Sequence, residues 1–429
     1  MKHLLLIPIL AVALTVNASI IHAEMARGVV FHDQNNNGSR ESQEPGIANV
    51  RVSNGVDIVS TDTHGKYELE VGDDTILFVL KPRNWSPPVD DHRLPQFYYI
   101  HKPTGSPDDS YQFAGVEPTG PLPNSIDFPL TPIDEPEEFS IVVIGDPQPY
   151  SREEVRFYAN DVIAELVDAN AAFGISLGDI VGDTLTLFEH VNAVQSKVGV
   201  PWYNVHGNHD INFHSPNDQY ADETFERVYG PANFAFQCAS VHFIVLDNVQ
   251  WNGSVDNNND GHPDQGNYVG ALHDSQIQFV ANYVAGVPDT ECIVICTHIP
   301  LISPDDTKYG TPQLPQLLEI LANHPHQLSF SAHTHYIRND FTGGHDGHSH
   351  PHDQGPDDLH TDHRSEVDDP HHHHFQIHHH HNTVTGSGSW YRGPKDEQGF
   401  PMTPMRDGVP NGYVIATFTG NEYKLRYKA

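Results

Sequence analysis

Short hydrophobic runs separated by polar turns fill the first part of the chain. Residues 28–31, 50–55, 66–71 and 75–80 form such runs, and the third alternates hydrophobic and polar positions strictly. A period of two places one side of a strand against a core. The pattern predicts a β-sandwich domain over residues 24–132, followed by a linker rich in proline and acidic residues.

A different pattern begins near residue 139. Uniformly hydrophobic runs within 139–146, 173–179, 202–210, 241–248, 292–300 and 328–335 predict buried strands. Helical spacing in 152–169, 274–286 and 314–324 places helices between them. Strands that alternate with helices predict a layered α/β domain, assigned to residues 139–343. Residues 384–429 return to short β-type runs, which predict a small C-terminal accessory domain.

The first 23 residues carry a separate signal. A basic start precedes an apolar run that ends in small residues near Ala18 and Ala23. This is the pattern of a secretory signal peptide, so the mature chain is expected to be periplasmic or secreted. No later stretch is long enough to cross a bilayer, so no integral membrane segment is expected after cleavage.

Composition narrows the possible partners. The 429 residues carry a formal net charge of −35, which disfavours nucleic acid and anionic membrane surfaces. A phosphorylated substrate remains compatible, because bound cations invert the local field. Cys292 and Cys296 lie about 13 Å apart on one predicted strand, too far for a disulfide. Free buried thiols are expected, with a bond from Cys238 to one of them as the alternative.

Residues 344–383 have a low-complexity composition. Positions 345–381 hold 14 of the chain's 32 histidines, mixed with aspartate, glycine and proline. Such a segment has too few apolar residues to bury a core, so a disordered insertion is predicted. A metal-buffering role and a solvated loop without a role both remain open.

Polar side chains follow five of the predicted strands. They are Asp146 with Gln148, Asp179, Asn208 with His209, His298, and His333 with His335. In open α/β sheets, ligands collect beyond the carboxyl ends of the strands. The recurrence of oxygen and imidazole ligands, without thiolates, predicts a site for Mn, Fe or Zn there.

The order "GDPQ", "GDIVGD", "GNHD", "CTHIP" and "AHTH" resembles the calcineurin-like metallophosphoesterase superfamily over residues 139 to about 340. The resemblance implies a four-layer α-β-β-α sandwich that holds two divalent transition-metal ions. Asp146 and His335 would bind one ion, and Asn208, His298 and His333 the other, with Asp179 bridging them. His209 would act at the leaving-group oxygen, oriented by Asp210.

Two positions depart from patterns within that superfamily. Gln148 stands where the common family pattern has histidine, and its amide oxygen is a neutral, weaker ligand. Binding of the first metal through this oxygen, action through a water and no binding all remain open. Gly182 stands where purple acid phosphatases have tyrosine, which excludes their coloured tyrosinate–iron site. The flanking regions resemble the accessory domains of one bacterial group of these enzymes. Four residues of the C-terminal region are candidate substrate contacts, with packing as the alternative: Trp390, Tyr391, Asn411 and Tyr413.

A loop in the N-terminal domain fits the spacing of calcium-binding EF-hand loops. Its candidate ligands are Asp33, Asn35, Asn37, Ser39, Glu41 and Glu44, with Gly38 at the sharp turn. Calcium binding and a polar turn stabilised by its own side chains are both compatible with this pattern. A related loop at residues 256–264 lacks the final glutamate.

Together these features predict an exported phosphoesterase. It would hydrolyse a phosphate mono- or diester by a metal-bridging hydroxide, acting on a small molecule or a phosphorylated envelope component. One alternative is a calcium-dependent surface or matrix binding protein with a relic phosphoesterase core. A second alternative is a metal-buffering protein built around the histidine tract.

Overall fold

The structure is a computed structural model that describes residues 23–107, 112–255, 265–303, 310–342 and 377–428. Nearly all of the predicted signal peptide, the loop at 256–264 and the histidine-rich segment up to residue 376 lie outside this range. Among the described residues, no helix has the length and apolar content needed to span a bilayer.

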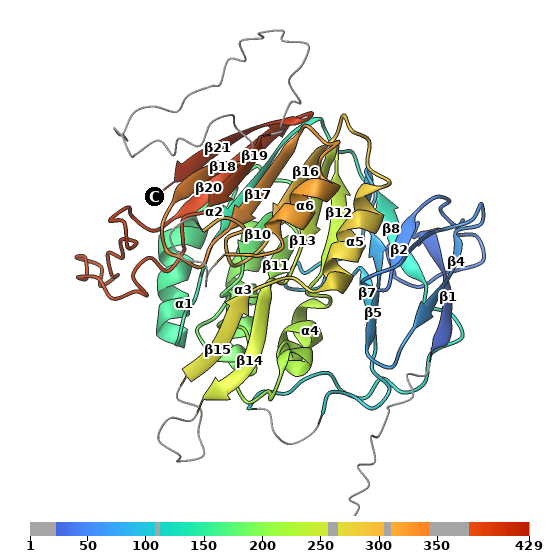
Figure 1. The fold of residues 1–429 in the computed structure, drawn as a ribbon, viewed down its shortest axis with the longest axis horizontal. Helices are drawn as coiled ribbons and strands as arrows, with labels where there is room; N and C mark the ends of the chain where they lie inside the picture. The colour runs from blue at the N-terminus through green and yellow to red at the C-terminus, as the bar shows by residue number, and fades with distance from the viewer. Residues whose placement is uncertain (1–22, 108–111, 256–264, 304–309, 343–376, 429) are drawn as a thin grey trace, which may run out of the picture.

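The N-terminal region is a β-sandwich, at the right of Figure 1. One sheet has the order β4 (Lys66–Val71), β1 (Glu24–His32), β8 (Phe128–Pro132) and β6 (Trp85–Ser86). The other has the order β3 (Ile58–Ser60), β2 (Arg51–Ser53), β5 (Thr75–Leu80) and β7 (Tyr98–His101). The alternation of hydrophobic and polar residues in 66–71 explains why β4 turns one face to the core of the sandwich. Tyr67, Leu69 and Val71 are buried, and the residues between them are exposed.

Two further sheets form the centre of the molecule. The five-stranded sheet has the order β11 (Trp202–Val205), β10 (Gly174–Leu177), β9 (Glu138–Ile144), β20 (Tyr413–Thr419) and β21 (Glu422–Lys428). The six-stranded sheet has the order β12 (Phe234–Cys238), β13 (Val241–Val245), β16 (Cys292–Cys296), β17 (Gln327–Ser331), β19 (His378–Asn382) and β18 (Arg338–Thr342). β14 (Val249–Val255) and β15 (Gln265–Gly270) pair as a hairpin.

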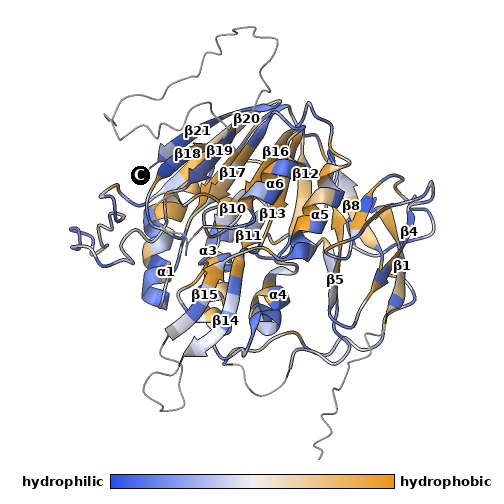
Figure 2. Ribbon diagram, in the orientation of Figure 1, coloured by the Kyte–Doolittle hydropathy of each residue, from blue (hydrophilic) through white to orange (hydrophobic). Residues whose placement is uncertain are grey.

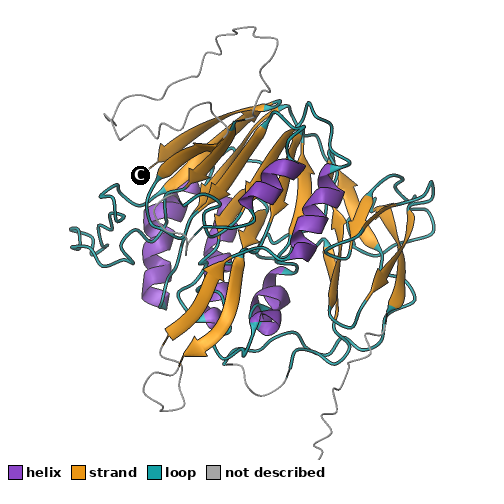
Figure 3. Ribbon diagram, in the orientation of Figure 1, coloured by secondary structure: helices purple, strands orange, loops and turns teal. Residues whose placement is uncertain are grey.

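Helices cover the outer faces of the two sheets (Figure 3). They are α1 (Arg152–Tyr158), α2 (Ala164–Leu166), α3 (Phe188–Gln195), α4 (Glu223–Tyr229), α5 (Asp274–Val284) and α6 (Leu314–Ile320). Strand β9 shows the layering. Ile141 and Val143 join the core between the sheets, whereas Val142 and Ile144 pack with α1 and α3. The predicted four-layer α-β-β-α architecture with an N-terminal β-sandwich is therefore confirmed.

The C-terminal strands complete the central sheets. β20 pairs antiparallel with β9 along its whole length, and β21 forms the edge beside it. The interior strands β9, β13 and β16 are mostly hydrophobic, whereas the interior strand β19 and the edge strands β18 and β21 are mostly hydrophilic (Figure 2). All three cysteines are buried and free, which confirms the expectation of unpaired thiols.

The predicted disordered insertion ends too late in the sequence. Residues 378–382, which the sequence placed in that segment, form β19, a buried strand between β17 and β18. Composition misled here because hydroxyls on β17 satisfy the imidazoles. Ser329 Oγ lies 2.8 Å from His378 Nε2 and 2.6 Å from His380 Nδ1. Buried polar side chains are stable when they are hydrogen-bonded in this way.

A buried ion cluster joins the N-terminal domain to α4. Lys102 Nζ lies 2.5 Å from Glu223 Oε1, 2.9 Å from Asp74 Oδ1 and 3.4 Å from Glu226 Oε2. Both Lys102 and Glu223 are buried. Three carboxylates that meet at the domain junction therefore share the single positive charge of this lysine.

Replacing Lys102 with methionine is expected to lower the free energy of unfolding by about 3–5 kcal/mol, because it leaves buried carboxylates without a cation. Urea unfolding of the full chain measures this. Arg27→Met is the matched control, because Arg27 pairs with Glu68 at an exposed site. That change is expected to cost at most about 1 kcal/mol. Equal losses in the two variants would contradict a structural role for the cluster.

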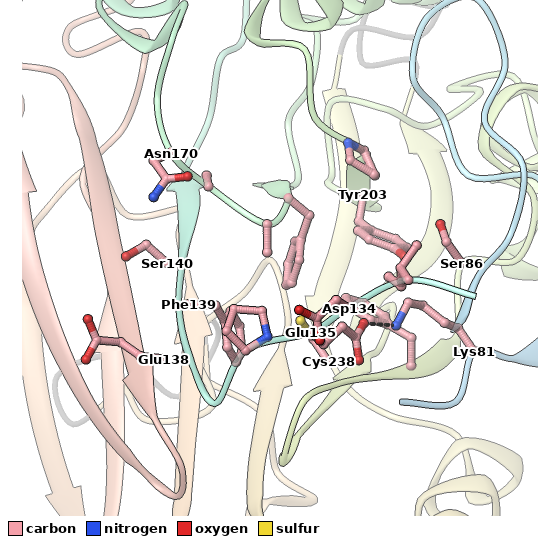
Figure 4. A pocket seen from close by; sticks show the side chains of 17 residues that line it. Lys81, Ser86, Asp134, Glu135, Glu138, Phe139, Ser140, Asn170, Tyr203 and Cys238 are labelled. Atoms are coloured by element: carbon pink, nitrogen blue, oxygen red, sulfur yellow. Dashed lines mark hydrogen bonds and ion pairs between the residues drawn. The ribbon is translucent and has the colours of Figure 1, made fainter. Parts of the chain in front are cut away.

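One cavity between the central sheets and the N-terminal domain lies far from the predicted site. It has a volume of about 360 Å³ and lies where β9 and β10 begin, against the N-terminal domain (Figure 4). The Lys81–Glu135 ion pair and Cys238 line it. The predicted ligands follow the opposite ends of these strands, roughly 20 Å away along β9. Cavity size alone therefore does not locate the polar site.

Candidate metal centre

The predicted ligands gather at the carboxyl ends of strands from both central sheets. Asp146 and Gln148 follow β9, Asp179 follows β10, and Asn208 follows β11 in the five-stranded sheet. His298 follows β16, and His333 and His335 follow β17 in the six-stranded sheet. All are buried except His333, which is partly exposed.

One half of the centre is built around His298. Its Nε2 lies 3.0 Å from Asn208 Oδ1, 3.3 Å from Asp179 Oδ1 and 3.2 Å from His333 Nδ1. Ligand atoms of Asp179, His298 and His333 all lie within 4.8 Å of one another. This spacing suits one cation held by imidazole nitrogen and oxygen ligands.

The other half contains two oxygen atoms without partners. Asp146 Oδ1 and Gln148 Oε1 are buried and have no hydrogen-bond partner among the described residues. His335 Nε2 lies 3.6 Å from Asp146 Oδ1. Burial raises the pKa of Asp146 to about 8, so an ionised carboxylate here needs a nearby cation at neutral pH. Buried acceptors of this kind fit a bound divalent metal.

Hydrogen bonds to backbone carbonyl oxygens orient two of the histidines, so that each directs Nε2 to the centre. His298 Nδ1 lies 2.7 Å from the Leu177 carbonyl oxygen and donates to it. His335 Nδ1 donates to the Gly388 carbonyl oxygen at 2.6 Å. With Nδ1 engaged in each bond, the lone pair on Nε2 is available to bind a metal, which is the usual way that proteins orient imidazole ligands.

The loops that carry these residues are strained. Asp146, Gln148, Asp179, His333 and His335 all have left-handed backbone conformations, with φ between 39° and 67°. Side chains other than glycine rarely adopt this region, at a cost of about 1–3 kcal/mol each. Hydrogen bonds between the loops offset part of the strain, since Gln148 N donates to Asp179 O, and His333 N to Asp146 Oδ2. Strain that clusters at strand ends in this way is typical of functional sites.

His209 lies at the open side of the centre. Its side chain is 26% exposed, and its Nε2 lies 3.9 Å from Asp179 Oδ2. Burial opposes protonation of His209, but the Asp179 and Asp183 carboxylates outweigh it and raise the pKa to about 9. Nε2 therefore has a hydrogen atom to donate and faces the ligand cluster.

The expected role of Asp210 is wrong. Asp210 accepts hydrogen bonds from the backbone N–H groups of Ile180, Val181 and Gly207. Its carboxylate thus joins two ligand loops instead of orienting His209. The partner of His209 is Asp183, whose Oδ1 lies 2.6 Å from His209 Nδ1. The second aspartate of "GDIVGD" was the available signal for this residue.

Family comparisons agree with this geometry. The family model described as "Calcineurin-like phosphoesterase" matches residues 139–336. Models for the N-terminal and C-terminal parts of calcineurin-like phosphoesterases match residues 34–117 and 380–429, so the three matches span most of the chain. The chain belongs to the calcineurin-like phosphoesterase family. It is a metal-dependent phosphoric ester hydrolase.

Three solved structures share low sequence identity with the chain. A dimetal phosphatase from Danio rerio is 13% identical and has a TM-score of 0.41, over 69% of this chain and 100% of that one. Purple acid phosphatase PPD1 from yellow lupin, Lupinus luteus, is 10% identical with a TM-score of 0.42, over 90% and 68%. GAP50 of Plasmodium is 13% identical with a TM-score of 0.35, over 68% and 84%.

One curated protein matches a short part of the chain. Colossin-A of Dictyostelium discoideum is 47% identical over 53 residues, which is 12% of this chain. The match covers 0% of the length of Colossin-A, to the nearest per cent.

The position of Gly182 has a structural explanation in this phosphoesterase. A side chain there would meet the Tyr150 ring, because a Cβ atom would lie 2.6 Å from three of its carbons. Tyr150 also contacts the His209 ring edge-on, with centroids 6.1 Å apart. The space that a tyrosine at position 182 would need is therefore filled from the β9 loop.

The four C-terminal candidates for substrate contact separate into two groups. The Trp390 ring lies on His335, with centroids 4.6 Å apart. Tyr391 is buried, and its hydroxyl donates to the Pro147 carbonyl oxygen, so it holds the ligand loop. Asn411 donates to Asp161 and Tyr413 to Glu165, both in the α1–α2 region and without contact to the predicted ligands. Of these four candidates, Trp390 is the one with a described ring contact to a predicted metal ligand.

The segment after β19 supports the half of the centre that contains Asp146 and His335, which the sequence did not reveal. Gly386 N and Ser387 N donate to the carbonyl oxygens of Gly145 and Asp146. Gly388 supplies the carbonyl that orients His335, and its φ is 54°. A Cβ atom at this position would lie 1.7 Å from the Thr403 carbonyl oxygen, so only glycine fits.

The predicted calcium loop is closed by its own hydrogen bonds. Asp33 accepts from the N–H groups of Asn37 and Gly38, and Glu44 accepts from those of Gln34 and Glu41. The amides of Asn35 and Asn37 donate to Glu41. Ser39 only donates its N–H group to Asn37. Calcium at this loop stays a prediction.

Proposed function

We propose that this phosphoesterase works with a dinuclear metal centre. Asp146, Gln148 and His335 would hold one cation, and Asn208, His298 and His333 the other. The observation that carries the proposal is the pair of buried, unpartnered oxygen atoms of Asp146 and Gln148 beside the compact His298 cluster. The mixture of oxygen and nitrogen ligands without thiolate favours Mn, Fe or Zn.

Asp179 is proposed to serve both cations. Its Oδ1 lies 3.3 Å from His298 Nε2, and its Oδ2 points towards His209. The backbone N–H of His209 donates to Oδ1 at 2.8 Å and fixes the carboxylate. Two cations, when bound, would supply charge neutralisation at the phosphoryl group and an activated water.

The protein's own acid is His209. Its Nε2–H would donate to the leaving-group oxygen as the ester bond breaks, because this partly exposed imidazole lies beside Asp179 and is not one of the proposed metal ligands. Asp183 accepts the Nδ1 proton and holds the ring in this orientation. Asp210 contributes indirectly by tying residues 180 and 181 to the loop at Gly207.

The substrate is proposed to be a phosphate mono- or diester, either a small molecule or a phosphorylated envelope component. The chain is proposed to act outside the cytoplasm, as a periplasmic or secreted enzyme. The support for export is the pattern of residues 1–23. Determining the N-terminus of the protein from its native source tests this, and a mature chain that still carries residue 1 would contradict it.

Hydrolysis assays test the reaction. Mature protein is stripped of metal and supplied with Mn, Fe, Zn or Ca in turn, with p-nitrophenyl phosphate and bis-p-nitrophenyl phosphate as substrates. Activity restored by a transition metal, with about two tightly bound ions per chain, is the expected result. A protein that binds no metal would overturn the proposal.

The pairing of Asp183 with His209 gives a second test. His209→Ala is expected to lower kcat about 100-fold or more, the usual contribution of a positioned acid. Asp183→Asn is expected to lower kcat about tenfold, with metal content unchanged. Because Asp183 acts through His209, the double variant should be no slower than His209→Ala alone. Additive losses would show that Asp183 does not act through this histidine.

A further inference from the structure

The turn at residues 405–407 is fixed to the loop that carries His333 and His335. Arg406 N donates to the His335 carbonyl oxygen at 3.1 Å, and Asp407 Oδ2 accepts from Ile337 N at 2.9 Å. The same loop supplies two of the proposed metal ligands. The position of Arg406 relative to the centre is therefore set by backbone hydrogen bonds as well as by its side chain.

Trp390 connects the Arg406 side chain to a metal ligand. The centroids of the Trp390 and His335 rings lie 4.6 Å apart, and the planes of the two rings meet at an angle of 30°. Arg406 Cζ lies 5.2 Å from the Trp390 ring centroid. Trp390 itself has a left-handed backbone conformation, with φ of 55°, so the surrounding chain imposes its orientation. A cation on an indole face is held by electrostatic attraction to the ring.

Arg406 has no carboxylate partner among the described residues. Its sequence neighbour Asp407 is engaged elsewhere, since its two oxygens accept from Ile337 N and Val409 N. Arg406 is exposed, so its guanidinium is accessible to a ligand in solution.

We propose that Arg406, positioned by Trp390, binds a second anionic group of the substrate beside the scissile phosphoester. The preferred substrates would then be phosphoesters that carry a further phosphate or comparable anion. A guanidinium binds phosphate through two parallel hydrogen bonds, which suits this role. The scissile group itself belongs to the metal ligands and His209, and the indole separates these from the guanidinium. This inference rests on the proposed function.

Two chromogenic diesters that differ in one phosphate test the inference. They are thymidine 5′-(p-nitrophenyl phosphate) and the same compound with a 3′-phosphate. Wild-type enzyme is expected to prefer the 3′-phosphorylated compound in kcat/KM. Arg406→Gln should lower this preference about tenfold, mainly through KM, because a charged hydrogen bond is lost. Trp390→Leu should lower the preference too, since it releases the guanidinium.

Binding gives a readout that is independent of turnover. Quenching of tryptophan fluorescence measures the Kd of thymidine 3′,5′-bisphosphate, which should rise about tenfold in Arg406→Gln. Arg27→Gln, at an exposed pair in the N-terminal domain, is the matched control and should leave both quantities unchanged. Added salt should weaken the wild-type preference, since the contact is partly exposed.

The outcomes separate the two proposals. Hydrolysis of neither diester, together with no hydrolysis of p-nitrophenyl phosphate, with any metal, would overturn the proposed function. Hydrolysis of both with equal efficiency, or a preference that Arg406→Gln leaves unchanged, would overturn the role of Arg406 and leave the phosphoesterase reaction standing.

Discussion

Replacing Asp179 with asparagine is expected to weaken the binding of both cations and to lower kcat/KM for p-nitrophenyl esters by at least about 100-fold. Losing a single hydrogen-bond partner of a metal ligand already costs 10–100-fold. Asp179 directs one oxygen to His298 and the other towards His209, and its backbone carbonyl accepts a hydrogen bond from Gln148 N in the other half of the centre. An amide removes the negative charge that offsets repulsion between two cations.

Metal content by elemental analysis and steady-state kinetics on the same preparation measure this effect. Asp57→Asn, an exposed position of the N-terminal domain, is the matched control and should retain full activity and about two ions. A variant that keeps both ions and wild-type turnover would show that Asp179 does not bridge them. Because the change keeps the side-chain shape, a fall in activity with unchanged thermal unfolding separates the metal effect from misfolding.

Most of the proposed ligands were predictable because each one directly follows a hydrophobic run. Asp146, Asp179 and His298 lie just beyond buried strands, and parallel neighbours bring such positions to one edge. The polar residues and the strand pattern thus give the same answer without knowledge of side-chain orientation. What this reasoning cannot give is the direction in which each side chain turns inside its loop.

Asp210 shows that limit. It is adjacent to His209 in the sequence, so adjacency suggested that it orients the ring. The turn at 207–210 instead directs its carboxylate to the N–H groups of residues 180 and 181, where it offsets unpaired backbone donors. Asp183 reaches the imidazole from another loop, and that encounter depends on tertiary structure.

The supporting carbonyl of Gly388 lies beyond sequence reasoning for the same reason. It orients His335 from a segment 53 residues further along the chain. A carbonyl group is present in every residue, so it leaves no compositional signal. The structure shows that the run "GSGSW" reaches the loops that carry Asp146 and His335.

Strand β19 is the clearest case in which composition and structure differ, and it makes the fold sensitive to acid. His378, His380 and His381 are buried in the six-stranded sheet. Burial lowers the pKa of His378 to about 4 and of His381 to about 3, and it lowers the pKa of His380 as well. Neighbouring histidines add to the effect, because protonating one opposes protonation of the next.

The sign of the pH effect follows from these directions. Unfolded histidine has a pKa of about 6.5, so between that value and the folded pKa the unfolded chain binds more protons. The free energy of unfolding should therefore fall as the pH drops from 6.5 towards 4. Each buried histidine contributes a slope of about 1.4 kcal/mol per pH unit. The loss should be absent above neutral pH, where both states are deprotonated at these residues.

Urea unfolding at pH 7.5, 6 and 5 measures this dependence, and His380→Gln isolates it. Glutamine keeps polar atoms near Ser329 and Ser331 but does not titrate. The slope of the free energy of unfolding against pH should therefore fall in the variant by the contribution of one histidine. Phe341→Leu, which removes an exposed ring from His379, serves as the control that alters the same strand pair without removing a titrating group. Equal slopes in His380→Gln and wild type would mean that β19 admits protons before the fold opens. The histidines of β19 would then be accessible to water in the folded protein instead of buried in the sheet.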